Sequence, residues 1–242
     1  MFMGLLNLPQ PLFEWIDKAL LGFLPPAARL LLWSIVAALL AMELYRLLSP
    51  QKRISAIKVE FREAQRSLND YDGPFDGAWP LISRVLGLAL RRVWLVLPAT
   101  LAASLPLLMV IVWLDASYGH RFPTAQEQVA VEVPAEGLVG RLDRPANQPP
   151  TAVVADASGT TVTEVMLKAP IPLLHKWQGW NLLLGNPAGY LPEDAPVDRV
   201  QLALPRLEVL SIGPDWLRGW EPTFFAALMI FAFLLKYLRR IE

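Results

Sequence analysis

The pattern of hydrophobic and polar positions is dominated by one long apolar run at residues 91–114. After the two arginines that open this run, no charged side chain follows before Asp115. As a helix, the run is long enough to cross a bilayer core of about 30 Å. Two prolines lie inside it, so neighbouring helices or the hydroxyls of Thr100 and Ser104 must satisfy the carbonyl groups that proline leaves without a donor. We therefore predict a transmembrane helix that packs against others.

Two further apolar runs complete the predicted membrane region. Residues 28–48 contain a single polar side chain, Ser34, in their central part. Residues 220–240 hold a shorter run, which Trp220 and a snorkelling Lys236 extend to about the thickness of a bilayer. The sequence thus predicts three membrane-spanning helices.

Amphipathic segments flank the first predicted span. Residues 1–26 carry apolar positions at helical spacing but are too short to cross a membrane. They form either an interfacial helix or an ordinary helix packed on the protein, and the pattern favours neither. Residues 49–90 are predicted to form a helical hairpin around the turn YDGPFDG. Its first helix carries a narrow apolar stripe that can pair with one partner or client helix: Ile54, Ile57, Phe61, Ala64 and Leu68.

The pattern changes in residues 115–219, where short alternating runs are separated by turns rich in Pro and Gly. We expect a small β domain, either a sandwich or barrel-like, and therefore an α+β membrane protein. The apolar segment 170–192 is interpreted as a loop or helix resting on the membrane. Trp216 and Trp220 are assigned to an interfacial aromatic belt. The predicted strands are 128–133, 137–142, 151–155, 160–166 and 199–204.

The basic residues predict an orientation. They cluster between the first two spans and behind the third, whereas the β domain carries more acids than bases. The positive-inside rule then places the N-terminus and the β domain outside, and the hairpin and the C-terminus in the cytosol. No organelle-targeting signal is visible, so a bacterial inner membrane is the expected compartment.

Composition narrows the range of functions. The formal net charge is zero, which gives no reason to expect a nucleic-acid partner. The chain has no cysteine, which excludes disulfides and thiolate catalysis. No phosphate-binding loop, nucleophile elbow or HExxH motif is present. His120 and His175 are interpreted as structural or interfacial. We expect neither an enzyme nor a cofactor or metal site.

In the order of its parts, the chain resembles the YidC/Oxa-type superfamily of membrane protein insertases. The resemblance rests on LLWSIVAALLAMELYRLLSPQKR and RRVWLVLPATLAASLPLLMVIVWL, and it covers residues 28–114 and 222–240. It implies three core helices around a hydrophilic groove and a cytosolic coiled coil that captures the client. A basic residue in the groove attracts acidic substrate tails. By resemblance, Arg46 is the candidate groove arginine and Ser34, Thr100 and Ser104 are the uncharged lining.

Three features depart from that family's pattern. The first span has no arginine near its middle, Glu43 lies beside Arg46, and a β domain stands where the bacterial insertases carry a helical hairpin. Glu43 and Arg46 are three residues apart, so they form either a snorkelling interfacial ion pair or a polar patch facing a cavity.

Two hypotheses of function follow. The first is an insertase-like protein whose partners are membrane lipids and client membrane proteins. The second is a structural or scaffolding subunit of an inner-membrane complex, with an outer β domain that binds a partner. A sensor with an outer ligand domain is a third possibility, which the small cytosolic part disfavours. An insertase predicts water around Ser34, Arg46 and Thr100, whereas a scaffold predicts that these residues pack against another chain.

Overall fold

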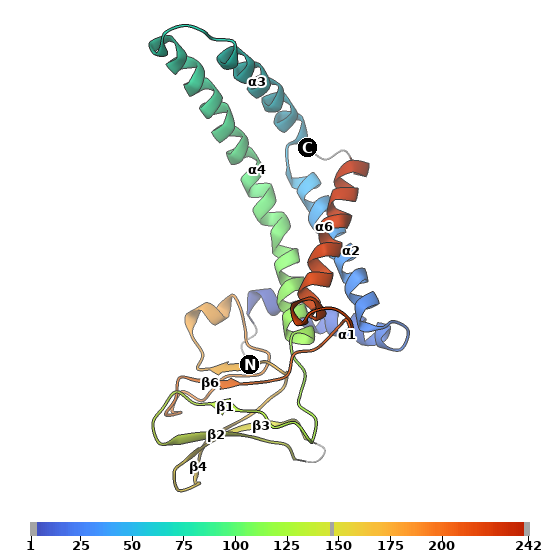
Figure 1. Ribbon diagram of the computed structural model, residues 1–242, viewed down its shortest axis with the longest axis vertical. Coiled ribbons are helices and arrows are strands. Elements are labelled where there is room, and N and C mark those ends of the chain that lie inside the picture. Colours follow the sequence, from blue (N-terminus) through green and yellow to red (C-terminus); the bar gives the residue numbers. More distant parts are fainter. Residues whose placement is uncertain (1–3, 146–147, 240–242) are drawn as a thin grey trace. The chain divides into compact units, whose positions relative to one another are not determined.

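The computed structural model describes residues 4–145 and 148–239 (Figure 1). Helices and two small sheets make up the chain, which divides into two compact units. The first unit comprises Met1–Trp33 and Leu108–Phe225, and the second comprises Ser34–Leu107 and Ala226–Glu242. Three long helices therefore begin in one unit and end in the other.

Three helices are long and apolar enough to cross a membrane: α2 (Pro26–Leu48), α4 (Phe75–Tyr118) and α6 (Trp220–Arg239). This confirms that long apolar helices lie at the three predicted positions within the described residues, and it is compatible with a multi-pass membrane protein. Each helix leaves most of its apolar surface uncovered by the rest of the chain. Exposed leucine, phenylalanine and isoleucine side chains are unfavourable in water but match a lipid environment.

The returning helix of the predicted hairpin and the second predicted span form a single helix, α4, of 44 residues. Its prolines do not end it. Thr100 donates a hydrogen bond to the Val96 carbonyl over 3.1 Å, and Ser104 donates one to Leu101 over 2.8 Å. Neither acceptor lies four residues before a proline, so these hydroxyls do not replace the hydrogen bonds that the prolines remove.

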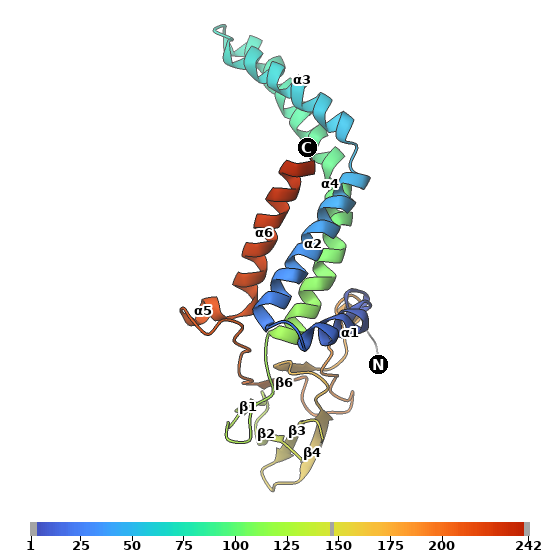
Figure 2. The same ribbon diagram turned by 90° about the vertical axis from the view of Figure 1, so that its right-hand side faces the viewer.

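Within the second unit, α3 (Gln51–Asn69) lies beside the first half of α4 and runs antiparallel to it (Figure 1; Figure 2). The apolar stripe of α3 faces inward, because Ile54, Ile57 and Ala64 are 1%, 5% and 2% exposed. A helix of the same chain, α4, lies beside this stripe, as the predicted helical hairpin requires, and contact with a client helix stays a prediction.

The β domain consists of two three-stranded antiparallel sheets in the first unit. The sheets contribute to one apolar core, in which Val154 and Leu167 from one side meet Leu174, Val200 and Leu202 from the other. This is the sandwich arrangement expected for alternating strands. In one sheet the strand order is β1 (Val131–Glu132), β6 (Arg199–Leu202) and β5 (Leu173–His175). In the other sheet it is β2 (Leu138–Asp143), β3 (Thr151–Asp156) and β4 (Thr161–Met166).

Segment 170–192 differs from its prediction, because it supplies strand β5 and the short 3-10 helix η2 (Gly179–Leu182). His175 ends the strand and is 9% exposed. Its ring lies 5.0 Å from that of Trp180 and 5.6 Å from that of Tyr190, so the residue is structural. Trp180 is 51% exposed and does not belong to the core.

The N-terminal amphipathic helix α1 (Gln10–Leu21) is held to the protein by a buried charge. Asp17 forms an ion pair with Arg29 and accepts hydrogen bonds from Trp33 Nε1 at 3.1 Å and Tyr118 Oη at 2.7 Å. We call these four residues the Asp17 clasp. Three donors therefore compensate the burial of the Asp17 carboxylate.

The apolar face of α1 is divided between two environments. Phe13 packs edge-on against Trp33 and Trp113, at centroid distances of 5.2 and 5.5 Å. Trp15 and Phe23 are 70% and 85% exposed. One part of the helix is thus packed on the protein, which was one of the two alternatives predicted for residues 1–26. The other part presents large apolar side chains of the kind that enter a membrane interface.

Candidate functional site

A cavity of about 540 Å³ lies in the second unit, where four helices contribute to one wall. Its lining combines an apolar surface with three polar side chains, one from each of α2, α4 and α6: Tyr45, Arg92 and Lys236. The apolar surface consists of Ile54, Phe61, Ala89, Val93, Val96 and Leu97. We call this the basic cavity.

Helical spacing explains how the chain builds the basic cavity. Ile54 and Phe61 are seven residues apart, so they project from one face of α3. On α4, Val93 is three residues before Val96, which places both on the side of that helix that lines the cavity. Lys236 belongs to the last turn of α6, where a cation is favoured by the helix dipole.

A half-exposed charge cluster joins α2 to α6 in the same unit. Glu43 binds Arg46, with Arg46 Nη2 2.8 Å from a carboxylate oxygen, and Arg239 Nε lies 3.2 Å from the other oxygen. The Glu43 side chain is 29% exposed, and those of the two arginines are 42% and 52% exposed. One carboxylate is therefore shared by two cations that remain in contact with solvent.

This arrangement suits a segment that is both apolar and negatively charged. The α3 and α4 side chains offer an apolar surface, while Arg92 and Lys236 place positive charge on the same cavity. Both cations are exposed, so an acidic group can reach them, and the adjacent apolar surface reduces the screening of their charge by water. No catalytic group is needed for this kind of recognition.

The predicted groove lining is not brought together in this cavity. Ser34 is 0% exposed and lies on a packed stripe of α2 with Ala37 and Ala38, each 1% exposed. Small residues of this kind allow close helix packing in membranes. Thr100 is exposed and Ser104 half-buried, and both hydroxyls bond to their own helix. The hydrophilic character expected of Ser34, Thr100 and Ser104 lies instead at Tyr45, Arg92 and Lys236.

The predicted partner-helix residues have mixed positions. Ile54 and Phe61 line the basic cavity, and Ile57 is buried at 5% exposure. Leu68 is half-buried near the end of α3. Two members of the stripe therefore line the cavity, and Ile57 is buried on the same face of α3.

The two tryptophans assigned to the membrane interface differ from each other. Trp216, in the short helix α5 (Asp215–Arg218), is 70% exposed, as a belt residue should be. Trp220 is 3% exposed and its ring lies 5.9 Å from that of Phe224 and 6.2 Å from that of Phe225. Its assignment to an exposed belt is wrong, because it packs within the protein.

Sequence reasoning missed Arg92 and Lys236 as site residues. Both were used only to derive orientation or to extend a span. A signal was nevertheless present, because each is a basic residue within one helical turn of an apolar run. The sequence alone did not show that Arg92 of α4 and Lys236 of α6 line the same cavity.

Comparison of the chain with protein-family models finds no match, and neither curated proteins nor solved structures give one.

Proposed function

We propose that this protein is an insertase-like membrane protein that assists the insertion or assembly of other membrane proteins. The observation that supports this best is the basic cavity, which combines an apolar wall from α3 and α4 with the cations Arg92 and Lys236. A client entering a membrane has matching features, since its apolar segment can contact the apolar wall and the polar residues that flank this segment can contact the cations.

The proposed mechanism lowers the cost of transferring a polar flank. The client's apolar segment contacts Ile54, Phe61 and Val96, which removes apolar surface from water. An acidic flank is stabilised by Arg92 and Lys236, which reduces the desolvation penalty of a charge entering the bilayer. The open helical faces then let the segment move sideways into lipid.

Glu43 limits this attraction. Because it neutralises part of the charge of Arg46 and Arg239, it weakens the field that an acidic segment meets at this end of α2 and α6. Arg46, the groove arginine implied by resemblance, thus acts as a second contact beside Arg92 and Lys236.

The proposed orientation follows from the basic residues around the spans. It places the helical hairpin in the cytosol of a bacterial cell, the basic cavity at the cytosolic ends of the spans, and the β domain on the outer side of the inner membrane. A newly made client would then reach the cavity from the side on which it is synthesised.

Site-specific photo-crosslinking tests the proposal. A photoreactive amino acid at Phe61 is expected to crosslink a ribosome-bound client with an acidic flank, whereas one at Val59, which is 52% exposed on the same helix, serves as the matched control. The double variant R92E/K236E is expected to shift the preference towards a client with a basic flank. Equal crosslinking at both positions, or an unchanged preference, would contradict the proposal.

A scaffolding subunit is the second candidate, and the position of Ser34 favours it. A fully buried Ser34 and self-bonded Thr100 and Ser104 leave less polar surface deep in the spans than a hydrated groove requires. A scaffold predicts that the crosslinker at Phe61 captures one protein in constant ratio, independent of protein synthesis. An insertase predicts many partners, which disappear when synthesis stops.

A further inference from the structure

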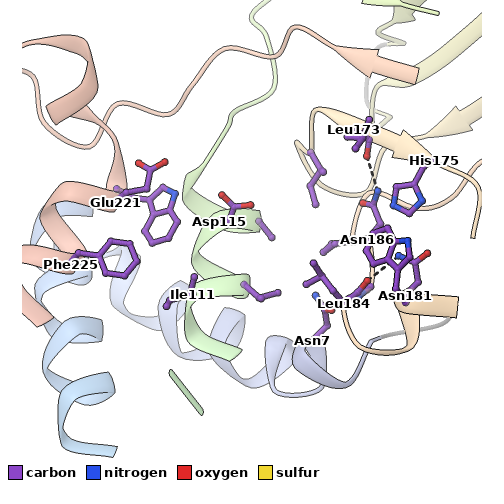
Figure 3. A pocket seen from close by; sticks show the side chains of 17 residues that line it. Asn7, Ile111, Asp115, Leu173, His175, Asn181, Leu184, Asn186, Glu221 and Phe225 are labelled. Carbon is purple, nitrogen blue, oxygen red and sulfur yellow. Dashed lines mark hydrogen bonds between the residues drawn. The ribbon is translucent and has the colours of Figure 1, made fainter. Parts of the chain in front are cut away.

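A second cavity, of about 450 Å³, lies in the first unit (Figure 3). The end of α4 contributes Ile111 and Asp115, and the beginning of α6 contributes Glu221 and Phe225. The opposite side comes from the segment around β5 and η2, which includes Leu173, His175, Asn181, Leu184 and Asn186. The cavity therefore adjoins the points where two candidate spans end.

The amide side chains of this cavity have structural roles. Asn186 Nδ2 donates to the Leu173 carbonyl over 2.8 Å, and Asn181 Nδ2 donates to the Leu184 carbonyl over 3.0 Å (Figure 3). Asn7 accepts a hydrogen bond from the Gly185 amide at 2.7 Å. These residues shape the wall, and they leave the two carboxylates as the charged groups.

Asp115 and Glu221 have no lysine or arginine partner among the residues that the structure describes. Neither carboxylate forms a hydrogen bond or ion pair within the described parts of the chain, and the described lining contains no lysine or arginine. His120 follows α4 and its charge would act on both carboxylates, but burial lowers its pKa below the ordinary value and so disfavours the charged ring. Asp115 is exposed and Glu221 is half-buried, so both carboxylates can be reached from the cavity and give its apolar wall a negative charge that a cationic ligand would match.

A third polar group supports a ligand. Trp220 lines the same cavity and is 3% exposed, and its indole N–H has no hydrogen-bond acceptor among the residues that the structure describes. Buried indole N–H groups in proteins usually have a partner. An oxygen atom close to the cation of the ligand would satisfy it.

We propose that this cavity binds the headgroup of an aminophospholipid. Its primary ammonium lies between Asp115 and Glu221, an ester or phosphate oxygen accepts from Trp220, and the upper acyl chains contact Ile111 and Phe225. The volume falls in the range of small-molecule sites, about 300–1,000 Å³. A free metal ion would leave the apolar wall unexplained, and an uncharged apolar ligand would leave the carboxylates unexplained. This inference does not depend on the proposed insertase function.

Native mass spectrometry of the full chain in detergent tests the proposal. Phosphatidylethanolamine is added in competition with phosphatidylcholine and phosphatidylglycerol, and the retained lipid is identified. We expect phosphatidylethanolamine to be retained in about tenfold preference, which is the ratio expected from one charge-assisted contact. Equal retention of all three lipids, or preference for the anionic one, would overturn the proposal.

Isosteric variants assign the preference to the carboxylates. D115N and E221Q are each expected to reduce it, and the double variant should abolish it. The conservative variants D115E and E221D keep the charge and should retain it. E132Q removes a carboxylate of strand β1, outside the lining, and serves as the control.

A folding defect is distinguished by the conservative variants and by circular dichroism of each protein. If the double variant keeps both its fold and its preference, the ammonium does not bind at these carboxylates and the proposal fails. The proposal also fails if the protein retains no lipid but a lysine-flanked transmembrane peptide binds and is lost in the double variant. That result would assign the cavity to a protein segment.

Discussion

Both ends of α2 carry an arginine that is paired with a carboxylate, and the two pairs differ in their surroundings. In the Asp17 clasp, the side chains of Arg29 and Asp17 are 8% and 12% exposed, and Trp33 and Tyr118 add hydrogen bonds. At the other end, Arg46 and Glu43 are 42% and 29% exposed. The same type of ion pair therefore differs in its consequence at the two ends. The buried pair holds the N-terminal helix in place, whereas the exposed pair can be replaced by contacts of Arg46 with another acidic group.

The energetic contrast follows from burial. Removing one partner of a buried pair leaves an uncompensated charge, whereas an exposed pair contributes little because water and salt screen it. The clasp should thus matter for stability, and the Glu43 cluster for recognition.

The largest effect is expected from breaking the clasp. D17A leaves Arg29 without its carboxylate and should lower the free energy of unfolding by about 3–5 kcal/mol. Thermal unfolding of the detergent-solubilised protein measures this. K18A, which removes a cation 78% exposed and 3.9 Å from Glu14, is the control and should cost less than about 1 kcal/mol. Similar losses in the two variants would show that burial does not distinguish them.

A smaller effect is expected from removing one donor of the clasp. Y118F deletes the hydroxyl that donates to Asp17 over 2.7 Å but keeps the Arg29 ion pair. Hydrogen bonds to charged groups contribute about 1.5–3 kcal/mol, so the loss should be of this size. Y71F removes an exposed hydroxyl whose acceptor is the Pro74 carbonyl, and it should be nearly silent. A silent Y118F would mean that Arg29 and Trp33 suffice for Asp17.

The exposed cluster should respond in the opposite way. E43Q is expected to change the unfolding free energy by less than about 1 kcal/mol. It also removes the acid that Arg46 and Arg239 share, so crosslinking of an acidic-flanked client at Phe61 should increase. A large loss of stability, or reduced crosslinking, would contradict this prediction and would show that Glu43 has a structural role, as Asp17 does.

The β domain offers a third pair, with the smallest expected effect. Arg121 binds Glu127 through two contacts of 2.7 and 2.6 Å, and this lowers the pKa of Glu127 from its ordinary value of 4.5 to about 2. Because the pKa of this carboxyl is lower in the folded state, the ion pair stabilises the fold at any pH above the pKa of the unfolded chain. That stabilisation is lost as the pH falls towards the pKa of the folded state. The melting temperature of wild type should therefore decrease more than that of E127Q between about pH 4.5 and pH 2. Parallel curves for the two proteins would contradict this assignment.

The periodic parts of the fold could be predicted from the sequence. Apolar length indicated the three long apolar helices, with Trp220 and Lys236 needed to extend the third, and alternation indicated five of the six strands in the described part of the chain. Strand β5 was missed because its residues lie in an apolar segment without alternation. The continuity of α4 was only partly visible, since prolines are usually read as breaks in a helix.

The candidate site was less predictable. Periodicity identified Ile54 and Phe61 as one helix face, but it could not show that Arg92 and Lys236 line the same cavity. The burial of Asp17 was also hidden, because its partners Arg29 and Tyr118 are distant in the sequence. Long-range pairing of charges is decided by packing, which a local pattern does not contain.

Cysteine accessibility tests the basic cavity most directly, because the chain has no native cysteine. Val96 lines the cavity, and Ala99, three residues later on the same helix, is 3% exposed. In intact membranes, a water-soluble thiol reagent applied from the cytosolic side should label V96C and leave A99C unlabelled. An acidic-flanked client should protect V96C. Protection of V96C without any client would contradict a hydrated client-binding cavity.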